Sequence, residues 1–168
     1  MRWLRRAGLC AAALVGVLII IWCGVMFSRP YVRDFSGRTY DEVVAVAGGD
    51  FGLPRSASNI RFVASSVGLG GRAHVVKFTA PVEDCRNYAL ADFRCYDTQQ
   101  GSNSAAEFTP VTGRLCRPTS FGEYGVRDLR WFDIETIEEG ITLERDHTHR
   151  PFTWIDTRRG ILYSLWTD

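Results

Sequence analysis

The sequence has almost no excess of either charge. Its 168 residues include 20 Lys and Arg against 19 Asp and Glu, which gives a formal net charge of +1. Beyond residue 30 the balance is 16 basic to 19 acidic residues. A nucleic-acid-binding protein gathers basic side chains, because phosphate contacts supply much of its affinity. The composition therefore lacks the electrostatic footprint of such a protein, and we predict no nucleic-acid partner.

Histidine is scarce, with three residues in the whole chain. Two lie in the stretch DHTHR, where His147 and His149 would point to the same side of an extended backbone, as a metal site requires. A zinc site needs three or four protein ligands, and His74 is the only other histidine. A polar loop explains the motif better, so we predict no metal and no cofactor. A small metal-assisted hydrolase using His147 and His149 is the alternative.

The sequence also lacks an assembled catalytic set. The glycines of GLGGR (residues 68–72) lead from one alternating segment into another, whereas a phosphate-binding glycine loop leads into a helix. Cys85 falls on the apolar stripe of a predicted helix, where cysteine usually acts as a small hydrophobic side chain. No motif is specific enough to indicate a family. We predict that the protein is not an enzyme.

What the chain does have is a long apolar run at residues 7–27, without a single charge. As a helix, these 21 residues would span about 31 Å, close to the ~30 Å hydrocarbon core of a bilayer. A cleaved signal peptide would have a shorter apolar region and small residues at its cleavage site, and a core helix would show a polar face. These two remain alternatives. We predict a retained single-pass transmembrane anchor at residues 7–27.

The predicted anchor sets the domain organisation. Residues 1–6 are short and basic, which favours a cytoplasmic N-terminus. Residues 28–38 would be a short tether, and residues 39–168 a domain outside the cytoplasm, in the cell envelope, with the lipid bilayer as one partner. Small residues recur every four positions in the run and would let two helices approach closely. A homodimer, and with it a structural protein dimerised through its transmembrane helix, is a further alternative based on Gly8, Ala12 and Gly16.

Periodicity predicts an α+β domain in the remainder. Two segments alternate apolar and polar side chains on either side of GLGG, which indicates a β-hairpin over residues 59–67 and 72–79. A helix beginning at Pro81 has one apolar stripe that continues to Tyr96. Three strand-like stretches, ITLER, PFTWID and GILYSLW, follow later in the chain.

Two further elements complete this prediction. A short helix is expected over residues 39–47, which two glycines end, and residues 97–124 are expected to be mostly loop. The predicted fold class is therefore an N-terminal transmembrane helix followed by a compact α+β domain. In that domain, an antiparallel sheet packs against one or two helices.

Aromatic residues are concentrated in the last two strand-like stretches, where both faces are apolar. One face must pack on the core, and the other is either covered by the irregular segment or exposed to a ligand or partner. The second possibility leads us to predict a binding or accessory module, whose partner is an unidentified envelope protein or ligand. Its surface would include Trp154, Tyr163 and Trp166.

Three of the five cysteines lie beyond the apolar run. Outside the cytoplasm a disulfide can persist. Cys85 and Cys95 are ten residues apart on one predicted helix, so they would be about 15 Å apart, which is too far for a disulfide. We therefore predict a Cys95–Cys116 bridge. A Cys85–Cys116 bridge, or none, remains open.

Overall fold

The structure is a computed structural model of the chain. Of residues 95–100 it describes the backbone alone. The residues that it describes are 14–24, 31–49, 51–67, 71–100, 106–116, 118, 126, 128–144 and 152–167.

The structure corrects the predicted transmembrane anchor at residues 7–27. The described helix in this region covers residues 14–24, and eleven residues span about 16 Å, roughly half of a bilayer core. In the described part of the chain, no helix has the length and apolar character needed to cross a membrane. The single-pass anchor and the fold class that contains it are therefore wrong. The cytoplasmic N-terminus and the domain outside the cytoplasm depended on that anchor, so these predictions are wrong as well.

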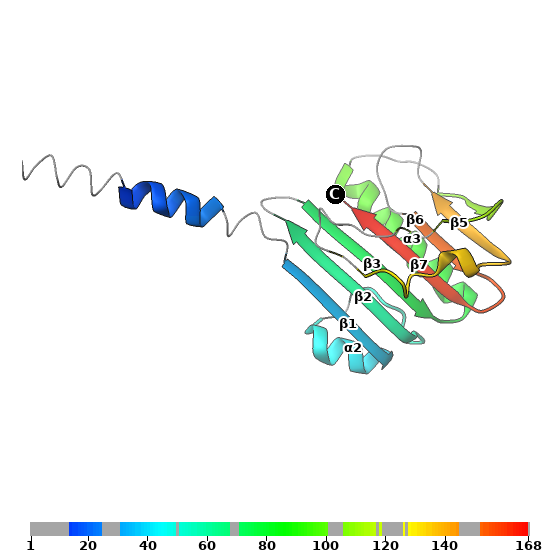
Figure 1. Cartoon of the computed structure of the whole chain (residues 1–168). Coiled ribbons are helices and arrows are strands. Elements are labelled where there is room, and N and C mark those ends of the chain that lie inside the picture. Colours follow the sequence, from blue (N-terminus) through cyan, green and yellow to red (C-terminus); the bar gives the residue numbers. More distant parts are fainter. Residues whose placement is uncertain are drawn as a thin grey trace, which may run out of the picture.

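The domain is built on one seven-stranded sheet in which each neighbouring pair is antiparallel, in the order β1-β2-β3-β7-β6-β5-β4 (Figure 1). The last strand therefore lies in the middle of the sheet, where it joins the two halves. The strands are β1 (Tyr31–Thr39), β2 (Ser58–Val67), β3 (Gly71–Thr79), β4 (Phe108–Pro110), β5 (Gly140–Glu144), β6 (Phe152–Asp156) and β7 (Ile161–Thr167).

The predicted hairpin is confirmed. Strands β2 and β3 pair from Ser58↔Thr79 to Val67↔Gly71, with one irregularity between Ser58 and Arg61. The helix predicted from Pro81 is also confirmed as α3 (Val82–Gln100), which has acidic residues in its first turn. The short helix predicted at 39–47 is α2 (Tyr40–Ala47).

Alpha helices cover one face of the sheet, which we call the first face. Helix α3 lies across this face in Figure 1, and its buried residues Cys85, Ala89 and Phe93 form the stripe that the sequence predicts. They pack against side chains that alternate along the central strands, among them Phe62 and Phe78. This core is almost entirely apolar, as expected where an amphipathic helix packs on a sheet.

An irregular segment, residues 128–137, covers part of the opposite face, which we call the second face. This cover segment contains one short 3-10 helix, η2 (Ile134–Thr136), and crosses in front of the sheet in Figure 1. Its residues Leu129, Phe132 and Ile134 are buried against Tyr163 and further side chains of the second face. Both faces of the central strands are therefore buried, which explains the apolar residues on both sides of β6 and β7.

Residues 31–38, expected to be part of a tether, belong to the edge strand β1. Helix α2 follows β1 directly and packs closely against it, since a Cβ atom on Gly37 would be 2.7 Å from Val43 Cγ2. The Glu42 carboxylate accepts a hydrogen bond from the backbone N–H of Arg38 at 2.7 Å. An edge N–H that is bonded in this way is not available to an added strand, so α2 protects this end of the edge.

Candidate functional site

The three aromatic residues predicted to form a surface do not share one. Trp154 and Tyr163 belong to the buried core of the second face, with exposed fractions of 8% and 0%. The ring of Trp166, which is partly buried, lies 5.0 Å from the imidazole of His74. The irregular segment covers the aromatic face instead, because Phe132 packs edge-on against both Trp154 and Tyr163.

The other predicted site residues are only partly within the described residues. His147 and His149 lie outside them, as do Gly8 and Ala12, while a Cβ atom placed on Gly16 would meet no described atom within 4 Å. Among the residues that the structure describes, no group of three His, Cys, Asp or Glu could hold a metal ion. The metal site and the helix pairing therefore stay predictions.

The cysteines show no bridge among those described. Cys85 and Cys116 are free, and the side chain of Cys95 lies outside the described residues, so the Cys95–Cys116 bridge stays a prediction. Cys85 is fully buried, and burial raises the pKa of its thiol to about 12. Such a thiol is protonated at neutral pH and is a poor nucleophile.

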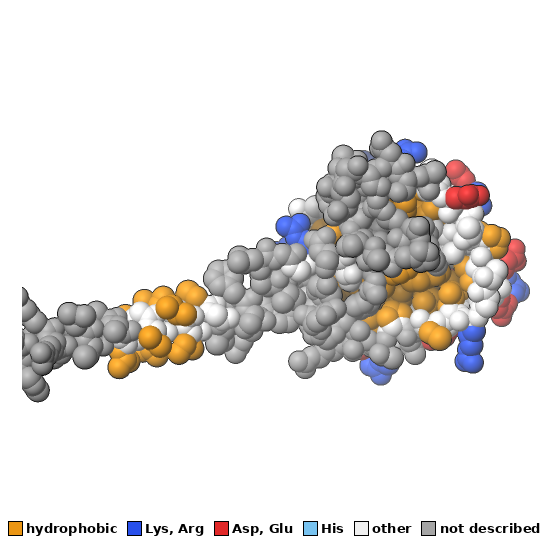
Figure 2. Space-filling model, turned by 90° about the horizontal axis from the view of Figure 1, so that it is seen from above, with side chains coloured by type: hydrophobic (Ala, Val, Ile, Leu, Met, Phe, Trp, Pro, Cys, Tyr) orange, Lys and Arg blue, Asp and Glu red, His pale blue; other side chains and the backbone are white. Residues whose placement is uncertain are grey.

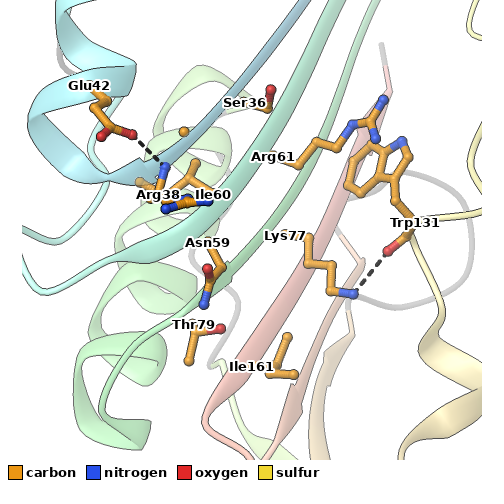
Figure 3. Close-up of a pocket in the computed structure, with 11 residues that line it drawn as sticks. Ser36, Arg38, Glu42, Asn59, Ile60, Arg61, Lys77, Thr79, Trp131 and Ile161 are labelled. Atoms are coloured by element: carbon orange, nitrogen blue, oxygen red, sulfur yellow. Dashed lines mark hydrogen bonds between the residues drawn. The ribbon is translucent and has the colours of Figure 1, made fainter.

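A groove of about 760 Å³ opens on the second face, beside the Trp131 end of the cover segment (Figure 3). Strands β1, β2, β3 and the start of β7 form its floor, and Trp131 forms part of its wall. Its lining residues are Ser36, Gly37, Arg38, Glu42, Asn59, Ile60, Arg61, Lys77, Thr79, Trp131 and Ile161.

A single row of side chains runs across the floor of the groove. Ser36, Arg61, Lys77 and Tyr163 are cross-strand neighbours on four successive strands. Side chains that are directly opposite on antiparallel strands project from the same face, with Cβ atoms about 5 Å apart. The row therefore places the cations of Arg61 and Lys77 next to each other.

Lys77 connects the sheet to the cover segment. Its ammonium donates to the backbone oxygen of Trp131 at 3.0 Å and to Asp133 Oδ1 at 2.5 Å. The Tyr163 hydroxyl donates to the same carboxylate oxygen at 3.1 Å. Burial raises the pKa of Asp133, but the hydrogen bond and charge of Lys77 outweigh burial, so this pKa lies below its usual value. The carboxylate is therefore ionised and fixed.

Arg61 lies between β1 and the cover segment. Its Nη2 is 3.0 Å from Asp34 Oδ2, and its guanidinium carbon is 5.0 Å from the centre of the Trp131 ring, an arrangement visible in Figure 3. Its Nε is buried without a hydrogen-bond partner among the described residues. Most buried donors in proteins are satisfied, so the unpaired Nε is a local exception.

A backbone irregularity lies at the end of the groove. Asn59 has φ of 49°, and the pairing of β2 with β3 shifts register between Ser58 and Arg61. Asparagine tolerates this left-handed conformation better than most residues do. Bulges of this kind change the direction of neighbouring side chains and are frequent beside binding sites. This one marks the position where the row begins.

Sequence reasoning missed this groove, although it placed Asn59 and Arg61 on the polar side of the hairpin. One signal was available: two cations opposite each other in a predicted hairpin. The register that brings them together depends on the irregularity at Asn59, and Trp131 and Asp133 come from a segment more than 50 residues away. Comparison of the chain with family models, with curated proteins and with solved structures found no match.

Proposed function

We propose that the protein is a non-enzymatic binding module and that the groove beside Trp131 is its ligand site. The observation that carries this proposal is the termination of the cover on the second face. The cover segment seals the aromatic part of that face, while charged and polar side chains line an open groove next to it. Ligand sites are typically concave and combine apolar walls with a few placed polar groups.

The contacts within the groove favour binding over catalysis. Lys77 and Asp133 form an ion pair with each other, and Lys77 also bonds to the backbone of Trp131. A general acid or base needs a pKa near the working pH and access to the reacting proton. The lowered pKa of Asp133 moves it away from that range. These groups support the shape of the groove.

The test is a two-dimensional NMR titration of the full chain with a fixed panel of probes: glucose, N-acetylalanine amide, succinate and inorganic phosphate. We expect backbone shifts that cluster on β1 to β3 around Ser36, Arg61 and Lys77. Ser36→Trp places an indole over the groove from an exposed position and should abolish those shifts.

Ser66→Trp is the matched control, because Ser66 is also exposed on a strand but lies away from the groove lining. It should leave the shifts intact. Shifts that are scattered over the surface, or that survive in Ser36→Trp, would contradict the proposed site. The competing hydrolase hypothesis is separated by metal analysis, since about one zinc ion per chain, lost in the double variant His147→Ala/His149→Ala, would favour it.

A further inference from the structure

The two cations in the floor of the groove require an explanation. Arg61 and Lys77 are directly opposite each other on β2 and β3. Like charges at such positions destabilise a sheet. Both are also partly withdrawn from water, with exposed side-chain fractions of 37% and 22%. Departures from a local rule of this kind tend to occur at functional sites.

The acids around the groove already have partners within the protein. Asp34 bonds to Arg61, and Asp133 bonds to Lys77 and Tyr163. The third, Glu42, accepts from the backbone N–H of Arg38. Each acid thus neutralises or caps a group at the rim, and Figure 3 shows Glu42 directed at the Arg38 backbone.

The cations, in contrast, keep unused hydrogen-bond donors. The guanidinium of Arg61 donates to Asp34 through Nη2, and its Nη1 has no bond among the described residues. The Lys77 ammonium has three donors and uses two. Arg38 is exposed at the same groove, and within the described part of the chain its guanidinium forms no ion pair. The groove therefore has more donors than acceptors.

From this excess we infer that the groove binds an oxyanion, a phosphate or carboxylate group, held by Arg61 and Lys77 with Arg38 at the rim. This inference rests on the proposed function and names the ligand class. A planar guanidinium suits bidentate contact with such groups, and an ammonium adds a point charge. Two adjacent cations favour a dianion over a monoanion of similar size, because each positive charge then has a counter-charge.

The experiment titrates the full chain with inorganic phosphate and with succinate, and compares each with acetate and with glucose. Binding is followed by the NMR shifts of Arg61, Lys77 and their strand neighbours. We expect a Kd of about 1 mM or tighter for the dianions. We expect weaker binding of acetate, no binding of glucose at these residues, and weakening as salt screens the charges. The phosphate and succinate arms separate the two sources of oxyanion.

Arg61→Gln should weaken dianion binding by about tenfold or more, the usual range for loss of a charge-assisted hydrogen bond. Because Arg61 also contacts Asp34 and Trp131, Arg38→Gln is a second variant that disturbs no ion pair among the described residues, and it should weaken binding by about threefold. Arg72→Gln makes the same change of charge on an exposed part of β3 outside the groove lining, and should have no effect.

The outcomes separate this inference from the function on which it rests. Binding of glucose or N-acetylalanine amide in the groove without dianion binding would overturn the oxyanion and leave the binding module. Dianion binding unchanged in both Arg61→Gln and Arg38→Gln would also overturn it. If no probe shifts the groove residues, both proposals fail.

Discussion

The two faces of the sheet are sealed in different ways. On the first face, helix α3 presents a regular stripe of small and large apolar residues, and the core beneath it is continuous. On the second face, a ten-residue irregular segment is fastened by buried aromatic side chains and by hydrogen bonds to Lys77 and Tyr163. A regular helix can seal a face by packing alone, whereas an irregular segment needs partners for its backbone polar groups.

The difference in sealing leaves a difference in exposure. The first face has its apolar side chains covered where α3 and α2 pack, and the second has an open polar groove at one end. Figure 2 views the molecule from above and shows the charged side chains around the outside of the domain, with the helix of residues 14–24 apolar on all visible sides. The second face, which has fewer regular elements over it, is the one that offers a site.

The largest expected effect comes from matched deletions in the two cores. Phe78 and Phe132 both have an exposed fraction of 0%. Phe78→Ala should lower the free energy of unfolding by about 4 kcal/mol, because a cavity under a regular helix collapses poorly. Phe132→Ala should cost about 3 kcal/mol, because the irregular segment can relax around the gap. Urea unfolding measures both.

Hydrogen exchange provides the second measurement on the same pair. In Phe132→Ala, faster exchange should be confined to the cover segment and its contacts, whereas Phe78→Ala should speed exchange throughout the sheet. An equal, global effect of both substitutions would mean that the two covers are equivalent, and the comparison would fail.

A smaller effect is expected from Lys77→Met, which keeps the length of the side chain and removes its charge. Asp133 would lose its ion pair, and the backbone oxygen of Trp131 would lose a donor. We expect a loss of about 2 kcal/mol in the free energy of unfolding, below the figure for a fully buried pair because both groups are partly exposed.

The matched control for Lys77→Met is Arg158→Met, which breaks an exposed ion pair with Glu138. Surface pairs of this kind contribute little, so the control should change stability by less than about 0.5 kcal/mol. The measurement is again urea unfolding. If both substitutions have the same small effect, Lys77 does not fasten the cover segment.

The smallest expected effects concern pH and distinguish the two faces by sign. On the first face, burial raises the pKa of Asp92 above its ordinary 3.8, although Ser164 donates to its carboxylate. Rising pH above about 4 then ionises the unfolded chain more readily and lowers stability. On the second face, the lowered pKa of Asp133 gives stability above about pH 4 that is lost as the pH falls through its folded pKa.

Unfolding measured between pH 3 and pH 7 tests these signs in two isosteric variants. Asp92→Asn should remove the decrease in stability on going from acid to neutral pH, and Asp133→Asn should remove part of the decrease on acidification. If the two variants have pH profiles of the same sign, the assignment of one acid to each face is wrong.

Much of the first face could be predicted from the sequence. The alternation in residues 59–67 and 72–79 and the apolar stripe of α3 are local patterns, so hairpin and helix were both found. The cover segment has no such period, because its residues are chosen for individual contacts. The groove could not be predicted either, since Trp131 is far from Lys77 in the chain.

The sequence by itself determined the elements whose pattern repeats over a few residues: the hairpin, the long helix and the strand character of the C-terminal stretches. It also showed an apolar run at residues 7–27, and the inference of a membrane span from that run was wrong, since composition does not fix how far a helix continues. Only the tertiary structure decided that β7 lies between β3 and β6, and which segment covers the second face. Those outcomes depend on contacts between distant residues, whose free energies no local pattern of the chain contains.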